Sequence, residues 1–60
     1  MNTINEFKRV IEERNIKSPI FEVNESIGNI NLLKNGETLY SAYFLQKNEI
    51  LDVIREFKLI

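Results

Sequence analysis

Three glutamates, Glu22, Glu25 and Glu37, come closest to a catalytic arrangement in this chain. A pair of carboxylates can carry out general acid–base chemistry when one of them has a raised pKa, and these three residues lie on neighbouring predicted strands. A chain of 60 residues leaves little room for the desolvated pocket that such a pKa requires. We therefore interpret the three glutamates as charges that keep a sheet edge soluble.

The chain contains no Cys and no His, which restricts its chemistry further. A Ser-His-Asp or Cys-His nucleophile cannot be assembled without these residues, and a structural zinc site lacks its usual ligands. We expect no enzymatic activity, no metal site and no cofactor.

The charge of the chain gives only a weak indication of its partners. Eight basic and nine acidic residues give a net charge of −1, which is not the basic footprint of a nucleic-acid-binding domain. A small nucleic-acid-binding regulator remains the alternative hypothesis. It would contact the phosphate backbone through basic residues that lie mostly in the first predicted helix, namely Lys8, Arg9, Arg14 and Lys17, with Lys47 as a further candidate. A steep loss of affinity with salt would distinguish this alternative from apolar association.

Length and hydropathy predict a single cytoplasmic domain over residues 1–60. No apolar run approaches the roughly 20 residues of a membrane span, and the first residues lack the pattern of a signal peptide. A domain of this size buries a modest fraction of its surface and often gains stability by oligomerisation. We therefore expect no membrane association and a homodimer.

Apolar residues with helical spacing predict a helix near each end of the chain. The N-terminal stripe consists of Ile4, Phe7, Val10 and Ile11, and the C-terminal stripe of Ile50, Val53, Ile54, Phe57 and Ile60. Thr3 and Glu6 match a capping box for the first helix, and Asn15 is a candidate left-handed C-cap. Polar residues 46–48 are N-cap candidates for the second helix, with Asn48 preferred. Lys8 with Glu12 and Arg9 with Glu13 are expected to pair on the exposed side of the first helix.

Between the helices, three short strands are predicted over residues 20–25, 30–34 and 37–45. Asn35 and Gly36 favour a two-residue type I′ turn, which makes the last two strands a hairpin. Pairing outward from this turn sets Lys34 opposite Glu37, Leu33 opposite Thr38, Leu32 opposite Leu39, Asn31 opposite Tyr40 and Ile30 opposite Ser41. The predicted fold is α+β: a three-stranded antiparallel β-meander flanked by N- and C-terminal helices, α-β-β-β-α, with both helices on one face of the sheet.

This register divides the hairpin side chains between two faces. The face assigned to the helices carries Ile30, Leu32, Leu39, Tyr43 and Leu45, and the opposite face carries Leu33, Tyr40, Ala42 and Phe44. An apolar face left in water indicates an interaction surface. In the alternative interpretation, Tyr40 forms a cross-strand pair, Phe44 packs in the entry turn of the second helix, and Leu33 is an ordinary exposed aliphatic residue. The C-terminal residues Leu59 and Ile60 are a second candidate contact, in competition with docking into the core of the protein itself.

These observations predict a non-enzymatic protein-binding module. It would act by occupying the surface of a larger protein, as small inhibitors or adaptors encoded by phages and other mobile elements would. The residues predicted to bind the partner are Leu33, Tyr40, Phe44, Leu59 and Ile60, because aromatic and apolar anchors dominate interface energetics.

Overall fold

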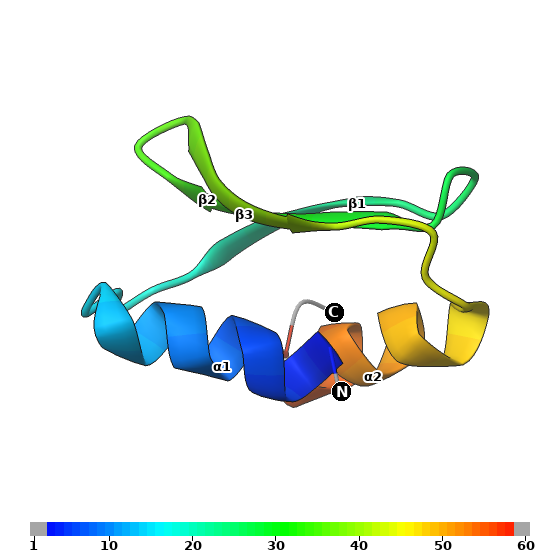
Figure 1. Ribbon diagram of the computed structural model, residues 1–60, viewed down its shortest axis with the longest axis horizontal. Helices are drawn as coiled ribbons and strands as arrows, with labels where there is room; N and C mark the ends of the chain where they lie inside the picture. The colour runs from blue at the N-terminus through cyan, green and yellow to red at the C-terminus, as the bar shows by residue number, and fades with distance from the viewer. Residues whose placement is uncertain (1–2, 59–60) are drawn as a thin grey trace.

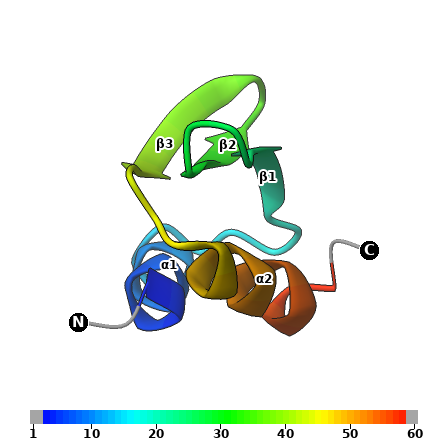
Figure 2. The ribbon, with the colours of Figure 1, turned by 90° about the vertical axis from the view of Figure 1, so that its right-hand side faces the viewer.

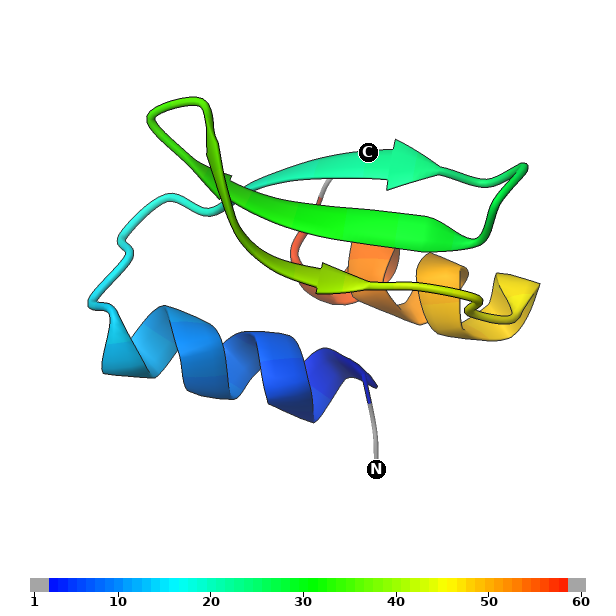
Figure 3. The same ribbon diagram turned by 45° about the horizontal axis from the view of Figure 1, so that its top comes forward.

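The computed structural model of the chain describes residues 3–58. Its elements are α1 (Thr3–Glu13), β1 (Ile20–Asn24), β2 (Asn29–Lys34), β3 (Glu37–Ala42) and α2 (Lys47–Glu56). The strands are antiparallel and lie side by side in the order β1-β2-β3 (Figure 3). The predicted α-β-β-β-α meander is confirmed.

The molecule has two layers, with the sheet above and both helices below it (Figure 1). Seen from the end, α1 lies toward the side of β3 and α2 lies toward the side of β1 (Figure 2). One edge of the helix layer, formed by α2, therefore lies under β1.

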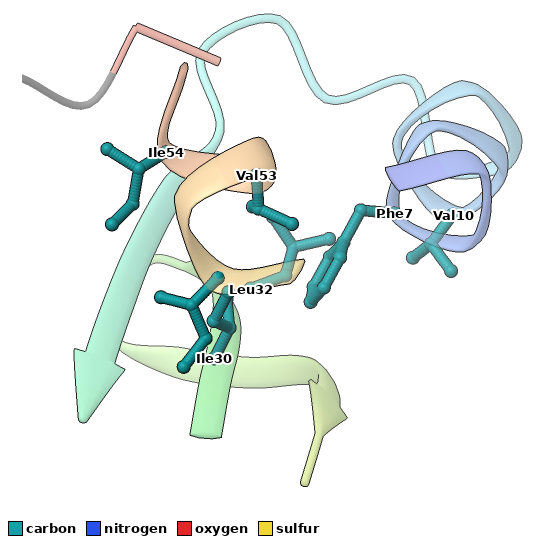
Figure 4. Close-up of a cluster of buried hydrophobic side chains, with 7 residues drawn as sticks. Phe7, Val10, Ile30, Leu32, Val53 and Ile54 are labelled. Atoms are coloured by element: carbon teal, nitrogen blue, oxygen red, sulfur yellow. The ribbon is translucent and has the colours of Figure 1, made fainter. Parts of the chain in front are cut away.

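The core lies between these layers and combines residues of both predicted helical stripes with residues of β2 (Figure 4). Its buried side chains are Phe7, Val10, Ile30, Leu32, Ile50, Val53 and Ile54. The ring of Phe7 meets those of Phe21 and Tyr40 edge to face, with both centroid separations at 5.1 Å, an arrangement worth about 0.5–1.5 kcal/mol per pair beyond the buried area. Phe7 thus joins α1 to both edge strands.

The end of α1 follows the sequence prediction. Asn15 has a positive φ of 52°, and its N–H donates to the Glu12 carbonyl at 3.3 Å, while the Ile16 N–H donates to the Ile11 carbonyl at 3.0 Å. This pair of bonds is a Schellman motif, which satisfies carbonyls that the helix end leaves free. The predicted C-cap at Asn15 is confirmed.

The beginning of α1 differs from the prediction. The Thr3 hydroxyl donates to the Glu49 carboxylate at 3.2 Å, and the Glu6 carboxylate accepts from Arg9 and Tyr40, each at 3.2 Å. Thr3 already lies inside α1, so the prediction that it is the N-cap of a Thr3–Glu6 capping box is wrong. The two side chains instead connect α1 to α2 and to β3, because tertiary partners compete for the same polar atoms.

The beginning of α2 lies two residues earlier than the preferred cap. Gln46 is the N-cap, and its N–H donates to the Glu49 carboxylate at 3.0 Å. A glutamate at this position also interacts favourably with the positive end of the helix dipole. The preference for Asn48 as N-cap is wrong, because that residue already lies inside α2.

The hairpin turn forms as predicted. Asn35 and Gly36 have positive φ angles of 53° and 82°, the combination that a type I′ turn requires. Lys34 pairs with Glu37 and Leu33 pairs with Thr38, so the first two predicted pairs are confirmed.

Beyond these two pairs, a β-bulge changes the register of the hairpin. The shift lies between Leu32 and Leu33, where Leu39 is the extra residue on β3. Leu32 consequently pairs with Tyr40, Asn31 with Ser41 and Ile30 with Ala42. The predicted pairs of Leu32 with Leu39, Asn31 with Tyr40 and Ile30 with Ser41 are wrong.

The bulge also changes which side chains face the helices. Tyr40 and Ala42 pack against the core, as do Ile30, Leu32 and Leu45. Tyr43 was assigned to the helix side but is exposed. A one-residue shift exchanges the two faces of a strand, so Tyr40 and Ala42 were assigned to the wrong face.

Candidate protein-binding surface

The residues predicted to bind a partner do not form one continuous face. Leu33 is partly buried on the outer face of the sheet, Tyr40 packs against the core, and Phe44 is 88% exposed in the connection after β3. Leu59 and Ile60 lie outside the described residues. The structure therefore separates Phe44 from the other two predicted sheet residues.

Tyr40 joins the sheet to α1. Its ring packs on Phe7, and its hydroxyl donates to the Glu6 carboxylate at 3.2 Å. Burial raises the pKa of Tyr40, and the nearby negative charge of Glu6 raises it further. These contacts hold the two layers together, so Tyr40 supports the fold and is not the aromatic anchor of an exposed face.

Two basic residues of α1 have carboxylate partners. Arg9 contacts Glu6 and Glu13, each at 3.2 Å, and Lys8 contacts Glu56 of α2 at 2.6 Å. The predicted pair of Arg9 with Glu13 is confirmed, whereas Lys8 bridges to α2 and does not pair with Glu12. The hydrogen bond and charge of Lys8 lower the pKa of Glu56. Nucleic-acid phosphates would have to compete with these carboxylates for Lys8 and Arg9.

The most exposed aromatic side chains lie between β3 and α2. Tyr43 is 59% exposed and Phe44 is 88% exposed, and their ring centroids are 6.4 Å apart. Exposed single apolar residues are common, but adjacent exposed aromatic residues form a larger apolar patch. The exposed aromatic pair therefore lies in this connection and not on a face of the sheet, where Tyr40 and Phe44 were predicted to lie together.

The backbone of Phe44 adopts a left-handed conformation, with φ +59°. A bulky residue rarely occupies this region, which costs roughly 1–2 kcal/mol for a residue with a Cβ. The next residue holds the chain in place, because the Leu45 N–H donates to the Gly28 carbonyl at 2.9 Å and the Leu45 side chain packs against the core. The ring of Phe44 is consequently directed away from the core.

The turn between β1 and β2 lies beside this connection (Figure 1). Gly28 has φ +75°, and a Cβ placed on it would lie 2.6 Å from the Leu45 carbonyl oxygen. The Asn24 side chain shapes the turn by accepting hydrogen bonds from the N–H groups of Ser26 and Ile27, at 3.1 and 3.4 Å. Ile27 is 57% exposed. We call Ile27, Tyr43 and Phe44 together the aromatic end.

The three glutamates considered for acid–base chemistry are separated along the sheet. Glu22 lies in the middle of β1, Glu25 lies in the turn after it, and Glu37 pairs with Lys34 beside the hairpin turn. Glu25 borders a cleft of about 200 Å³ whose other lining residues are Leu45, Lys47 and Ile50. This volume is below the roughly 300–1,000 Å³ of typical small-molecule sites. The arrangement favours the solvent-exposed interpretation of these glutamates.

Sequence reasoning identified Phe44 but missed Ile27 and Tyr43. Tyr43 was placed in a continuous strand because aromatic residues favour β structure. A signal for the connection was present, since Phe44 and Leu45 immediately precede the polar N-cap region of the second helix. Ile27 could not be identified in this way, because only the pairing of Gly28 with Leu45 brings its turn beside Phe44.

Comparison of the chain with protein-family models, curated proteins and solved structures finds no match. Within residues 3–58, neither helix has the length and apolar character needed to cross a membrane. In the same part of the chain, no group of three or more acidic side chains lies close enough to hold a metal ion.

Proposed function

We propose that this protein is a non-enzymatic protein-binding module that attaches to a larger protein through the aromatic end. The observation that supports this proposal is Phe44, which combines 88% exposure with a positive φ. Asn or Gly would adopt the same positive φ with less conformational strain than Phe. Strained conformations of this kind tend to occur at binding sites, so a phenylalanine here is better explained by a contact than by folding.

The surroundings of Phe44 suit an anchor residue. Tyr43 extends the apolar area around it, with the two ring centroids 6.4 Å apart, and the exposed Ile27 lies in the adjoining turn. The hydrogen bond from the Leu45 N–H to the Gly28 carbonyl, 2.9 Å long, joins the two segments. A rigid aromatic residue loses little conformational entropy on binding, and aromatic anchors contribute much of the energy of protein interfaces. The partner would be a protein with an apolar pocket that accepts the ring.

The proposal includes the role and location expected from the sequence. The module would act as an inhibitor or adaptor in the cytoplasm, by covering a surface of its partner. The absence of Cys and His from the sequence supports a function without catalysis. We also propose a homodimer, with Leu59 and Ile60 as its candidate contact residues. Light scattering on the purified chain measures the mass in solution and so tests for the dimer.

Replacement of Phe44 by Asn tests the aromatic end. We expect Phe44→Asn to raise the free energy of unfolding by about 0.5–1 kcal/mol, because Asn tolerates positive φ. The same change should abolish capture of the partner from extracts of the source cell. Chemical denaturation and quantitative pull-down measure the two effects.

Leu33→Thr is the matched comparison, since it removes an apolar side chain from the outer sheet face. If the aromatic end is the binding surface, the Leu33→Thr variant should still capture the partner protein. A folded Phe44→Asn variant that captures the same protein as the wild type would contradict the proposal. Failure of the wild-type chain to retain any specific protein would contradict it too.

A further inference from the structure

Within residues 3–58, no strand pairs with the outer edge of β1, which we call its free edge, and this edge is the less protected of the two sheet edges. β1 pairs with β2 over five consecutive residues, from Ile20 to Asn24, without a bulge. The other edge strand, β3, carries the bulge at Leu39, and bulges protect edges by twisting them. β1 also lacks Pro and Lys, the residues that commonly guard edges. Its main-chain groups are therefore suited to pairing with an added strand.

A shallow cleft lies on the side of α2 that is directed away from α1. The cleft has a volume of about 290 Å³ and is lined by Leu51, Ile54, Arg55 and Lys58. The opposite side of α2 carries Glu49 and Glu56, which bond to side chains of α1. α2 lies on the β1 side of the helix layer (Figure 2), and Ile54, which lines the cleft, points away from α1 (Figure 4). The cleft therefore lies on the side of α2 that is nearer to the outer edge of β1.

We call the free edge of β1 and this cleft together the β1–α2 flank. A strand added beside β1 would direct alternate side chains toward the helix layer, where the cleft lies. Its apolar part is formed by Leu51, which is 38% exposed, and by Ile54. Its border is basic, since Arg55 and Lys58 line the same cleft.

The basic border leaves positive charge available to a partner. Arg55 contacts Asp52 at 3.6 Å, which is a long separation for an ion pair on a solvent-exposed helix. Lys58 takes part in no ion pair within residues 3–58. Glu22, the charged residue of β1, pairs with Asn31 on the outer face of the sheet, so it lies on the side away from α2.

We propose that the β1–α2 flank binds an extended segment of another protein, which adds to the sheet as a fourth strand next to β1. The segment carries an apolar residue and an acidic residue two positions apart, so that both point toward α2. The apolar side chain fills the cleft at Leu51 and Ile54, and the carboxylate meets Arg55 and Lys58. Main-chain hydrogen bonds supply affinity in this mode of recognition, and the alternating side chains supply specificity.

A second copy of the chain fits this flank less well. Two-fold pairing of β1 with its own copy would bring both cleft surfaces together, and each copy contributes Arg55 and Lys58. Like charges at an interface oppose association. The charge of the flank therefore favours an acidic partner, and this surface is separate from the aromatic end.

Synthetic octapeptides test the proposal on the complete 60-residue chain. The first probe, TLTETLTE, places Leu and Glu on one face of an extended strand. The second, TLETTLET, has the same composition but places Leu and Glu on opposite faces, and the third, TLTKTLTK, replaces each Glu by Lys. Titration followed by amide chemical shifts should show binding of TLTETLTE with changes in β1 and α2. The other two peptides should bind up to about fivefold more weakly, since an exposed charge pair contributes at most about 1 kcal/mol to affinity.

Charge reversal on the protein provides the matching experiment. The double variant Arg55→Glu with Lys58→Glu should prefer TLTKTLTK over TLTETLTE, and Lys34→Glu at the distant hairpin should retain the wild-type preference. Dispersed amide spectra establish that each variant is folded. Equal affinity for all three peptides, or no binding of TLTETLTE at millimolar concentration, would overturn the proposal. A doubled solution mass with β1 amides protected in the absence of peptide would overturn it in favour of self-pairing.

Discussion

Phe44 and Gly28 occupy the same region of backbone space for different reasons. Both have positive φ angles, of 59° and 75°, and they lie on the two segments that meet at the aromatic end. Gly28 is required sterically, because a Cβ there would lie 2.6 Å from the Leu45 carbonyl oxygen. Phe44 is not required in this sense, since a smaller residue would suit its backbone better. Its side chain is therefore the more informative of the two about function.

Alanine substitution at Gly28 and at Gly36 should distinguish two causes of instability, a steric clash of the added Cβ and the strain of a positive φ. Gly28→Ala should lower the free energy of unfolding by about 2 kcal/mol or more, since it adds a clash to the cost of positive φ. Gly36→Ala should lower it by only about 1 kcal/mol, because nothing lies within 4 Å of a Cβ at that position. Urea denaturation of both variants measures the difference, and equal losses would contradict the close packing of the turn against Leu45.

The bulge in β3 is the feature that decides the faces of the hairpin. Without it, Tyr40 would point into solvent and Leu39 would point toward the helices. With it, the Tyr40 ring reaches Phe7 and its hydroxyl reaches Glu6, which packs a large aromatic side chain against the core. The gain from burying this ring outweighs the irregular pairing at Leu39.

Deletion of Leu39 should leave the pairing of β3 intact. Thr38 would then be followed directly by Tyr40, and a regular ladder would keep Leu33 opposite Thr38 and Leu32 opposite Tyr40, as they are now. We expect a folded variant whose free energy of unfolding lies within about 2 kcal/mol of the wild type, in the usual range for single changes. Cross-strand NOEs between Leu32 and Tyr40 report the register. Loss of the NOEs in a folded variant would contradict this account of the bulge.

At the scale of the whole molecule, the two proposed surfaces lie in different places and differ in chemistry. The aromatic end is apolar and is formed by two connections that meet beyond the sheet. The β1–α2 flank combines a main-chain edge with a cleft bordered by Arg55 and Lys58. A chain of 60 residues could thus contact a partner at one surface and an extended segment at the other.

Ionic strength should distinguish these two surfaces in one protein. Binding of TLTETLTE should weaken several-fold between 20 mM and 500 mM salt, because screening reduces the attraction to exposed charges. Capture of a partner through Phe44 should change little over the same range, because apolar burial does not depend on charge. Parallel titration and pull-down experiments measure both effects. A steep salt dependence of capture would instead favour the phosphate-binding alternative.

The sequence by itself determined the elements and their order. The helical stripes, the Asn35-Gly36 turn and the Asn15 cap depend on interactions within a few residues, so local patterns were sufficient to predict them. Only the tertiary structure decided the bulge, the face of Tyr40 and the position of the aromatic end. These features depend on Phe7, Glu6 and the Gly28–Leu45 contact, which join segments far apart in the chain, and pairing outward from the turn contains no information about such partners.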